Sequence, residues 1–279
     1  MAHPAHELTL DLTQTPPTTL AANARARRIH WILRLGAAAC FIGHGAFGII
    51  TKAAWVPYFS AVGIGPDTAY TLMPVVGTVD ILMGAGVLVS PRPFVLLYMV
   101  VWAFWTALLR PLAGEPVFET LERAGNYGVP LAMLLFIGWP RTVRGWFTGS
   151  HGVMADARTI AWILRVTTAS LLFGHGALQA ITGKAVFAAH YAALGLPATA
   201  VATLGAAEIT AAVIVLVAPS PPLLVGIAIW KVATEALFPI SGAPIWELIE
   251  RGGSYAAPLA LALLLLKGTA LLTSRGKSQ

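Results

Sequence analysis

The stretches WILRLGAAACFIGHGA and WILRVTTASLLFGHGA, which begin at Trp31 and Trp162, are two versions of one apolar pattern. A second matched pair follows in the same order. It comprises WAFWTALLRPLAGEPVFETLERAGNYGVPLA from Trp102 and WKVATEALFPISGAPIWELIERGGSYAAPLA from Trp230. Matched blocks in the same order are the signature of an internal repeat, so the sequence predicts a tandem duplication of a unit of roughly 125 residues.

The composition indicates a membrane protein. Hydrophobic residues make up 57% of the 279 residues and charged residues only 11%, whereas a typical globular protein has about 25% charged residues. Such a chain cannot cover a water-exposed surface with polar groups, so we expect the lipid bilayer to be its solvent. The net charge of +6 is interpreted as membrane topology, and no nucleic-acid partner is expected. The single cysteine, Cys40, excludes an internal disulfide.

Each unit contains four apolar segments, which are continuously apolar and too long to be barrel strands. They are residues 29–50, 70–89, 94–112 and 126–140 in the first unit, and 159–181, 198–217, 221–238 and 253–273 in the second. Because the number per unit is even, both units enter the membrane the same way up. The predicted fold is all-α, with eight transmembrane helices forming two parallel four-helix repeats related by a pseudo-twofold axis along the membrane normal.

Lys and Arg residues are more numerous on the side of the two termini. This bias predicts that both termini are cytoplasmic, in a bacterial-type inner membrane. The first apolar run is long enough to span and follows a polar stretch, so it is not expected to be a cleaved signal. The expected division is a flexible cytoplasmic tail (1–28), a first repeat (29–140), a cytoplasmic linker (141–158), a second repeat (159–273) and a cytoplasmic tail (274–279).

Ionisable side chains inside a membrane are costly, so they mark functional sites or buried partners. The candidates are Arg34 and Arg165, His44 and His175, Asp80 and Glu208, and Lys231 with Glu235. The arginines either hold an anionic or quinone head group or snorkel to the interface. The histidines, each in a GHGA tetrapeptide, bind a ligand, carry a proton or only link helices. The two acids either transfer protons or neutralise a buried base such as Arg34, Lys52, Arg165 or Lys184.

Lys231 and Glu235 are neighbours on one face of the predicted seventh helix. The first repeat has Ala103 and Ala107 at the corresponding positions. If only one repeat carries a polar site, we expect it to be the second.

The most specific pattern is P-x-x-G-x-P-x-x-E-x-x-E-R-x-G-x-Y-x-x-P, at residues 111–130 and again at 239–258. It predicts a short periplasmic helix with i, i+4 ion pairs. The residues concerned are Glu119, Glu122 and Arg123 in the first copy and Glu247, Glu250 and Arg251 in the second, with Glu119–Arg123 and Glu247–Arg251 as the pairs. The element either caps the bundle or forms a partner-docking surface or a mouth for protons or cations. The sequence contains no Cys/His cluster with metal-ligand spacing, so no metal site is expected.

The run GKAVFAAHYAALGLPATAVATLGAAEITAAVIVLVAPSPP (residues 183–222) resembles the DoxX-like family of membrane proteins. In that family a first helix ends near a lysine, a short aromatic segment with a leucine-glycine-leucine-proline turn follows, and a second helix carries a central acid. The matching residues are Lys184, 187–197 and Glu208, and in the first repeat Lys52, 55–66 and Asp80. The resemblance implies four-helix units and a respiratory setting. DoxX/DoxD-type proteins include membrane subunits of a thiosulfate:quinone oxidoreductase, a methylamine-utilisation protein and cargo-type receptors.

We therefore expect an integral membrane subunit of a quinone-linked redox assembly with a redox partner subunit. If it takes part in catalysis, it does so as an oxidoreductase subunit. Two alternatives stay open. One is a non-enzymatic, proton-coupled transporter or small-molecule binder that uses the crevice between the repeats. The other is a haem-binding electron carrier through His44 and His175, although quinone suits the pattern better than haem.

Overall fold

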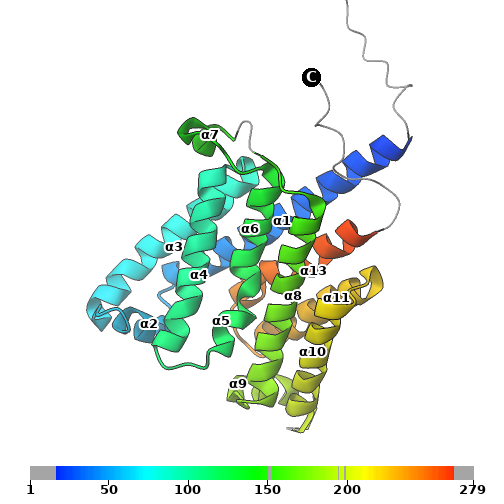
Figure 1. The fold of residues 1–279 in the computed structure, drawn as a ribbon. Coiled ribbons are helices and arrows are strands. Elements are labelled where there is room, and N and C mark those ends of the chain that lie inside the picture. The colour runs from blue at the N-terminus through cyan, green and yellow to red at the C-terminus, as the bar shows by residue number, and fades with distance from the viewer. Residues whose placement is uncertain (1–16, 150–152, 194, 198, 267–279) are drawn as a thin grey trace, which may run out of the picture.

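The computed structural model describes residues 17–149, 153–193, 195–197 and 199–266, in which nearly all regular structure is helical (Figure 1). The one β-type pairing among these residues is an isolated antiparallel bridge between Trp139 and Val153. The all-α prediction is therefore confirmed.

The helices divide into two series along the chain. The first comprises α1 (Pro17–Ile49), the 3₁₀ helix η2 (Ala53–Trp55), α2 (Val56–Ser60), α3 (Pro66–Val89), α4 (Pro93–Leu112), α5 (Phe118–Glu122) and α6 (Ala124–Ile137). The second comprises α7 (Val143–Thr148), α8 (Ala157–Ala180), α9 (Ala185–Ala192), α10 (Thr199–Val217), α11 (Pro221–Ile240), α12 (Trp246–Ile249) and α13 (Gly252–Leu265). Figure 1 shows α2, α5 and α9 at one end of the bundle, and α7 at the other end with the start of α1.

Local sequence signals set several helix boundaries. Pro66, Pro93 and Pro221 occupy the first turns of α3, α4 and α11, where a missing backbone N–H costs nothing. The Asp156 side chain caps α8 by accepting a 2.7 Å hydrogen bond from the Thr159 backbone N–H.

Each of the eight apolar segments overlaps a helix, although two of the predicted boundaries need correction. The predicted tail 1–28 is wrong for its last part because α1 begins at Pro17. Its sequence there is rich in alanine, a strong helix former, and Arg25 donates a 2.8 Å hydrogen bond to the Leu266 carbonyl. The linker 141–158 contains the short helix α7. Residues 1–16, 267–273 and the predicted tail 274–279 lie outside the described residues.

Six segments of the described chain are long and apolar enough to cross a membrane. They are Ala24–Ile49, Pro66–Val89, Pro93–Leu112, Thr199–Val217, Pro221–Ile240 and Trp246–Leu265. Helix α6 is also apolar, but it has only 14 residues. Helix α8 has 24 residues and carries Arg165, His175 and Gln179 in its interior, which places polar groups where a lipid-facing helix would have apolar ones.

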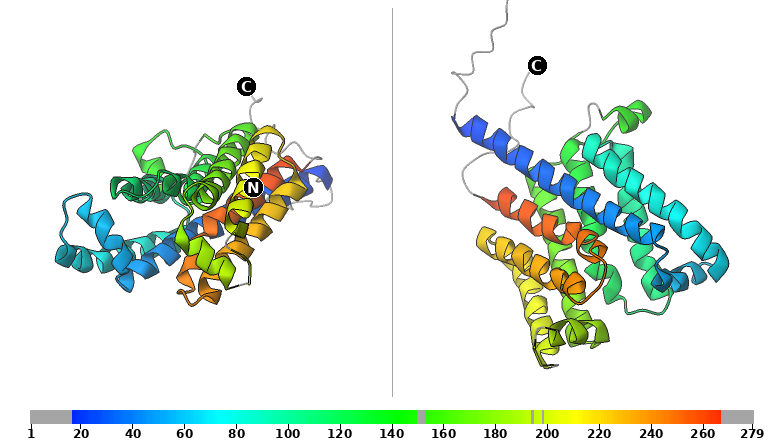
Figure 2. Two further views of the ribbon diagram at one scale, coloured as in Figure 1. Left: turned by 90° about the horizontal axis from the view of Figure 1, so that it is seen from below. Right: turned by 180° about the vertical axis from the view of Figure 1, so that it is seen from behind.

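Helix α13 contacts α1, α6 and α8 at the centre of the molecule, and α6 also contacts α1 and α8 (Figure 2). Each of these helices carries an outer helix: α3 lies on α1, α10 on α8, α4 on α6 and α11 on α13. The short helices cross between the series, because α12 contacts α1 and α5 contacts α8. The same kinds of contact thus occur in both series.

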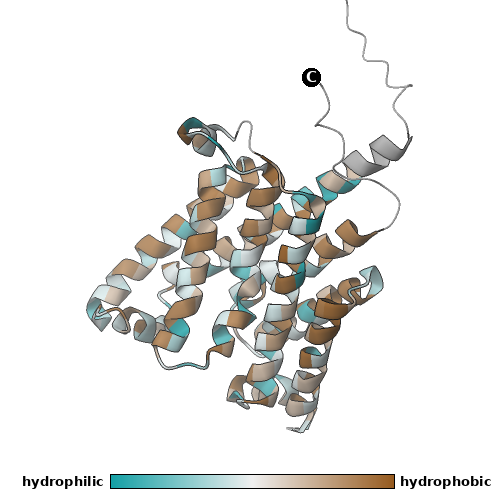
Figure 3. Ribbon diagram, viewed as in Figure 1, coloured by the Kyte–Doolittle hydropathy of each residue, from teal (hydrophilic) through white to brown (hydrophobic). Residues whose placement is uncertain are grey.

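The outer helices α3, α4 and α10 consist largely of hydrophobic residues (Figure 3), and several of their large apolar side chains are exposed. Val75 and Leu82 of α3 are 58% and 59% exposed, and Ile229 of α11 is 66% exposed. A continuous apolar exterior of this extent requires lipid rather than water. The chain is therefore a helical, multi-pass integral membrane protein.

Candidate functional site

The two GHGA tetrapeptides are places where backbones come close together. A β-carbon on Gly45 would lie 2.5 Å from the Gly77 carbonyl oxygen of α3, and one on Gly43 would clash with the Glu250 backbone that follows α12. Gly176 and Gly174 make the same kinds of approach to α10 and to α5. The first glycine of each tetrapeptide therefore allows the backbone at a short helix of the other series to pack closely. The second glycine allows close packing of the neighbouring outer helix, α3 or α10. These close contacts place each intervening histidine among polar groups.

In the second series, His175 belongs to a closed hydrogen-bonded cluster. Its Nδ1 contacts Glu208 Oε2 and lies 2.8 Å from Nε2 of Gln179. The Trp230 indole donates a 2.6 Å hydrogen bond to the other oxygen of Glu208, and Tyr191 donates one of 3.0 Å to Gln179. The His175 and Glu208 side chains are only 2% and 3% exposed, so the cluster is sealed within the protein.

In the first series, His44 has a different environment. Its Nδ1 lies 2.8 Å from Asp80 Oδ2, and its ring stacks on Trp55 with 4.4 Å between centroids. The His44 side chain is 25% exposed, whereas that of Asp80 is 1% exposed. Asp80 Oδ1 and the indole nitrogen of Trp102 are both buried without a hydrogen-bond partner. Of the two alternatives for these acids, neutralisation of Arg34, Lys52, Arg165 or Lys184 is not what the structure shows, because each acid contacts the histidine of its own series.

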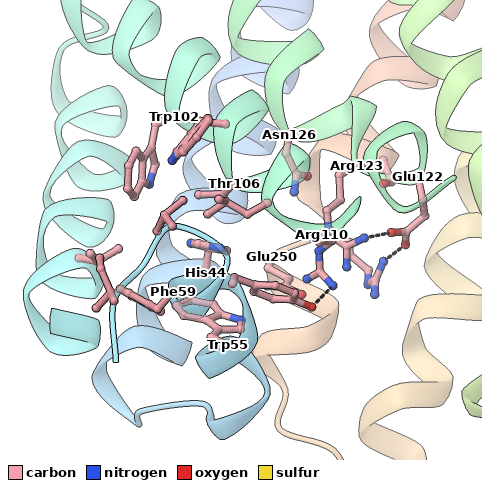
Figure 4. A pocket seen from close by; sticks show the side chains of 18 residues that line it. His44, Trp55, Phe59, Trp102, Thr106, Arg110, Glu122, Arg123, Asn126 and Glu250 are labelled. Carbon is pink, nitrogen blue, oxygen red and sulfur yellow. Dashed lines mark hydrogen bonds and ion pairs between the residues drawn. The ribbon is translucent and has the colours of Figure 1, made fainter. Parts of the chain in front are cut away.

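His44 lines a cavity of about 160 Å³ (Figure 4). Its lining residues are His44, Trp55, Tyr58, Phe59, Val62, Ile64, Val76, Trp102, Trp105, Thr106, Leu109, Arg110, Glu122, Arg123, Asn126, Glu250, Arg251 and Ser254. Figure 4 shows the rings of Phe59 and Trp102 on the side opposite Arg123 and Glu122, with His44 between them. The cavity therefore has an aromatic side and a charged side.

A hydrogen-bonded group lies on the wall formed by α2 and the end of α4. Arg110 donates a 2.7 Å hydrogen bond to the Tyr58 hydroxyl, which in turn donates to Glu115. Burial raises the pKa of Tyr58 to about 12 despite the nearby guanidinium. Partial burial opposes ionisation of Glu115, but the Tyr58 hydroxyl and the charges of Arg110 and Lys184 outweigh it and lower the pKa of this carboxyl.

Ion pairs join the two series at this end of the bundle. The predicted pair of Glu119 and Arg123 is present, with 2.6 Å between Glu119 Oε2 and Arg123 Nη1. The other predicted pair is wrong, because Glu247 binds Lys52 at 2.6 Å and Arg251 binds Glu122 and Glu235. Sequence spacing alone suggests pairs within one helix. In the structure, Glu247 and Arg251 instead lie close to Lys52 and Glu122 of the first series and pair with them.

Glu122 is held between two guanidiniums, those of Arg123 and Arg251. Burial opposes its ionisation, but these charges outweigh the loss of solvation and hold the pKa of this carboxyl well below its usual range. Glu122 is therefore a charged link between the series.

Lys231 and Glu235 form a buried pair with 2.7 Å between Nζ and Oε1, as their spacing predicts. Glu235 Oε2 also lies 2.8 Å from Arg251 Nε, and the Lys231 and Glu235 side chains are 1% and 0% exposed. The pair fills the positions where the first series has Ala103 and Ala107. The polar groups expected in the second series are thus neutralised by one another, and the described cavity lies beside the first series.

The two arginines predicted as site candidates lie away from the cavity. Arg34 donates a 2.7 Å hydrogen bond from Nε to the Val87 carbonyl, and Arg165 donates one of 2.9 Å to the Val215 carbonyl. Each guanidinium also lies over a tryptophan, Trp31 or Trp162. Both arginines therefore satisfy carbonyls near the ends of α3 and α10.

Several residues of the site were not predicted. Trp102 and Trp230 are the first residues of the two copies of the second repeated block. Their matching positions could have indicated that the two tryptophans have similar roles. Arg110 and Gln179 had no such signal, because the opposite series has Phe238 and Gly48 at those positions.

Within the described ranges, no three His, Cys, Asp or Glu side chains are grouped so that they could hold a metal ion. Comparison of the chain with family models, curated proteins and solved structures finds no match. The geometry of the cavity is therefore the basis for a functional proposal.

Proposed function

We propose that this protein is a membrane subunit of a quinone-linked redox assembly, and that the cavity beside His44 receives the quinone ring. The observation that carries the proposal is a histidine, backed by a buried carboxylate, facing a one-ring cavity with aromatic walls. The likeness to DoxX-like proteins supports the same role.

The size and walls of the cavity suit a single ring. A volume of about 160 Å³ is close to that of a protein cavity known to accept benzene, about 150 Å³. Trp55 and Trp102 offer flat faces for stacking. A haem is far larger than this space, so a quinone fits better than a haem bound through His44.

Asp80 gives His44 a defined chemical role. A carboxylate on Nδ1 keeps the proton of the neutral ring there, so Nε2 is free to accept a proton. The same carboxylate stabilises the imidazolium that results. His44 can therefore take one of the two protons released when a quinol is oxidised, or return one when a quinone is reduced; the second proton is exchanged with solvent, and the two electrons pass to or from a redox partner subunit.

The unpaired buried atoms support a ligand at this place. Asp80 Oδ1 and Trp102 Nε1 have no protein partner, and such groups cost about 1–3 kcal/mol each when left unsatisfied. A ligand oxygen that accepts a hydrogen bond from the Trp102 N–H, and a water or quinol hydroxyl that donates one to Asp80 Oδ1, would reduce this cost.

The proposal includes the arrangement of the chain in the membrane. We take the two series as two parallel four-helix repeats about a pseudo-twofold axis, giving eight membrane helices with both termini in the cytoplasm. The contacts of α1 with α3, α12 and α13 correspond to those of α8 with α10, α5 and α6, which supports this arrangement.

The test compares binding and turnover. Purified protein in lipid nanodiscs should bind a short-chain benzoquinone, and His44→Ala should abolish saturable binding. His30→Ala is the matched control, since His30 lies in the same helix but outside the cavity. Membranes containing the protein should show more quinone reductase activity than membranes without it. Equal binding by the wild type and His44→Ala proteins would contradict the proposal.

A proton-coupled transporter is the second candidate, and one observation favours it. Ion pairs run without a break from the partly exposed Lys184 through Glu119, Arg123, Glu122 and Arg251 to the buried Glu235–Lys231 pair. Ionisable side chains buried within a membrane protein mark ion and proton pathways in transporters. Flux into proteoliposomes that depends on a proton gradient, and is lost in Glu208→Gln, would support this candidate. Unchanged flux would remove the role of Glu208.

A further inference from the structure

A second hollow lies on the lipid-facing side of α4. It is an open groove of about 630 Å³ between α4 and α7, lined chiefly by Phe94, Leu97, Tyr98, Val101, Trp146 and Phe147. No charged side chain lines it. Val101 is 60% exposed and Phe147 is 58% exposed, so the groove is open to the surrounding lipid.

The groove and the ring cavity share two walls. Trp102 and Trp105 line both spaces, so one pair of indole rings separates the charged interior of the cavity from an apolar channel along α4. Trp105 is 39% exposed, which places this boundary at the edge of the protein rather than in its centre.

We propose that the groove holds the hydrocarbon tail of the same ligand whose ring occupies the cavity. The inference rests on the proposed function and adds a ligand class: a quinone with a long isoprenoid or alkyl chain that enters sideways from the bilayer past Trp102 and Trp105. A ring that carries such a tail needs an apolar path that begins at the wall of its own cavity. The groove is such a path, because it meets the cavity at Trp102 and Trp105.

Two probes with one ring test the inference. They are 2,3-dimethoxy-5-methyl-1,4-benzoquinone without a tail, and the same ring with a decyl tail. Saturable quenching of tryptophan fluorescence is measured on the full chain in nanodiscs, after subtraction of empty nanodiscs. Val101→Phe places a larger side chain in the groove, and Val213→Phe is the matched control on the exposed face of α10.

We expect Val101→Phe to weaken binding of the tailed probe about tenfold, the effect typical of a changed contact in an apolar pocket. Binding of the tail-free probe should be unchanged, which also shows that the variant is folded. Val213→Phe should affect neither probe. If Val101→Phe leaves both affinities unchanged, a phospholipid chain rather than the ligand tail occupies the groove and the inference is wrong. If wild-type protein binds neither probe, the proposed function itself fails.

Discussion

The indole nitrogen of Trp230 donates a hydrogen bond of 2.6 Å to Glu208, whereas the indole nitrogen of Trp102 and Oδ1 of Asp80 have no partner in the described part of the chain. The two acids occupy matching positions in the repeat that the sequence predicts, and aspartate is shorter by one methylene group. In the second series the tryptophan and the acid therefore satisfy each other. In the first series both groups lack a hydrogen-bond partner, and the Trp102 side chain lines the cavity.

Asp80→Glu should give the first series the bond seen in the second. We expect an increase in stability of about 1 kcal/mol, because the longer side chain can reach the Trp102 indole and pair two buried groups. Ring binding should weaken, because those groups are no longer free. Thermal unfolding in detergent and quinone titration measure the two effects. A variant that is both less stable and better at binding would contradict this explanation.

Lys231 and Glu235 should show strong coupling. Lys231→Ala leaves the buried Glu235 carboxylate with Arg251 and the more distant His175 ring, and we expect it to destabilise the protein by about 3 kcal/mol. The double variant Lys231→Ala/Glu235→Ala copies the alanines of the first series and should cost less than the two single variants added together. The measurement is the free energy of unfolding of the wild type, Lys231→Ala, Glu235→Ala and the double variant in one detergent, which together form a double-mutant cycle. Simple additivity would show that the pair contributes no interaction energy.

The pH dependence of stability should report Glu122. Because its pKa is lower in the native state than in the unfolded chain, its stabilising contribution is complete above the unfolded value of about 4.3. It then decreases as the pH falls towards the native value. Glu122→Gln should be less stable at pH 6 and should lose less stability between pH 6 and pH 3. Melting temperatures across this range measure both slopes, and parallel curves would show that Glu122 does not contribute.

Gly174 should tolerate no side chain. A β-carbon there would overlap the backbone of α5 at Glu122, so Gly174→Ala should separate α5 from α8 and lower stability by a few kcal/mol. Gly226→Ala is the matched control in α11, where no atom lies within 4 Å of the added carbon. That variant should be neutral or slightly stabilising, because alanine favours helix over glycine. Similar melting temperatures for both variants would show that the close approach is unimportant.

Much of the helical framework could be predicted from the sequence because lipid imposes long apolar runs. The predicted starts at 94 and 221 lie within one residue of those of α4 and α11, whereas α3 begins four residues before the predicted 70, and the repeated blocks located α5 and α12. The start of α1 was missed because its first turns are not apolar, so helix propensity rather than hydropathy carried the signal.

The site was less accessible to sequence reasoning because its contacts link distant segments. The candidates His44 and Asp80 do meet, as do His175 and Glu208. Spacing within one helix suggested Glu247 and Arg251 as partners, but each binds a residue from another segment. Whether a matched polar pair faces a cavity or a sealed cluster depends on neighbours such as Ala103 and Lys231, and therefore on the fold.

The contact between α1 and α13 has a consequence for biosynthesis. The surface of α1 around Gly36 and Gly43 fits against Gly252 and Glu250, which the ribosome adds only when translation is almost complete. Before α13 is synthesised, this surface of α1 has no protein partner in the bilayer. The insertion machinery or annular lipid must therefore cover it. Premature termination before α13 would leave a nascent chain whose earliest segment cannot be assembled, and membrane proteases would be expected to remove it.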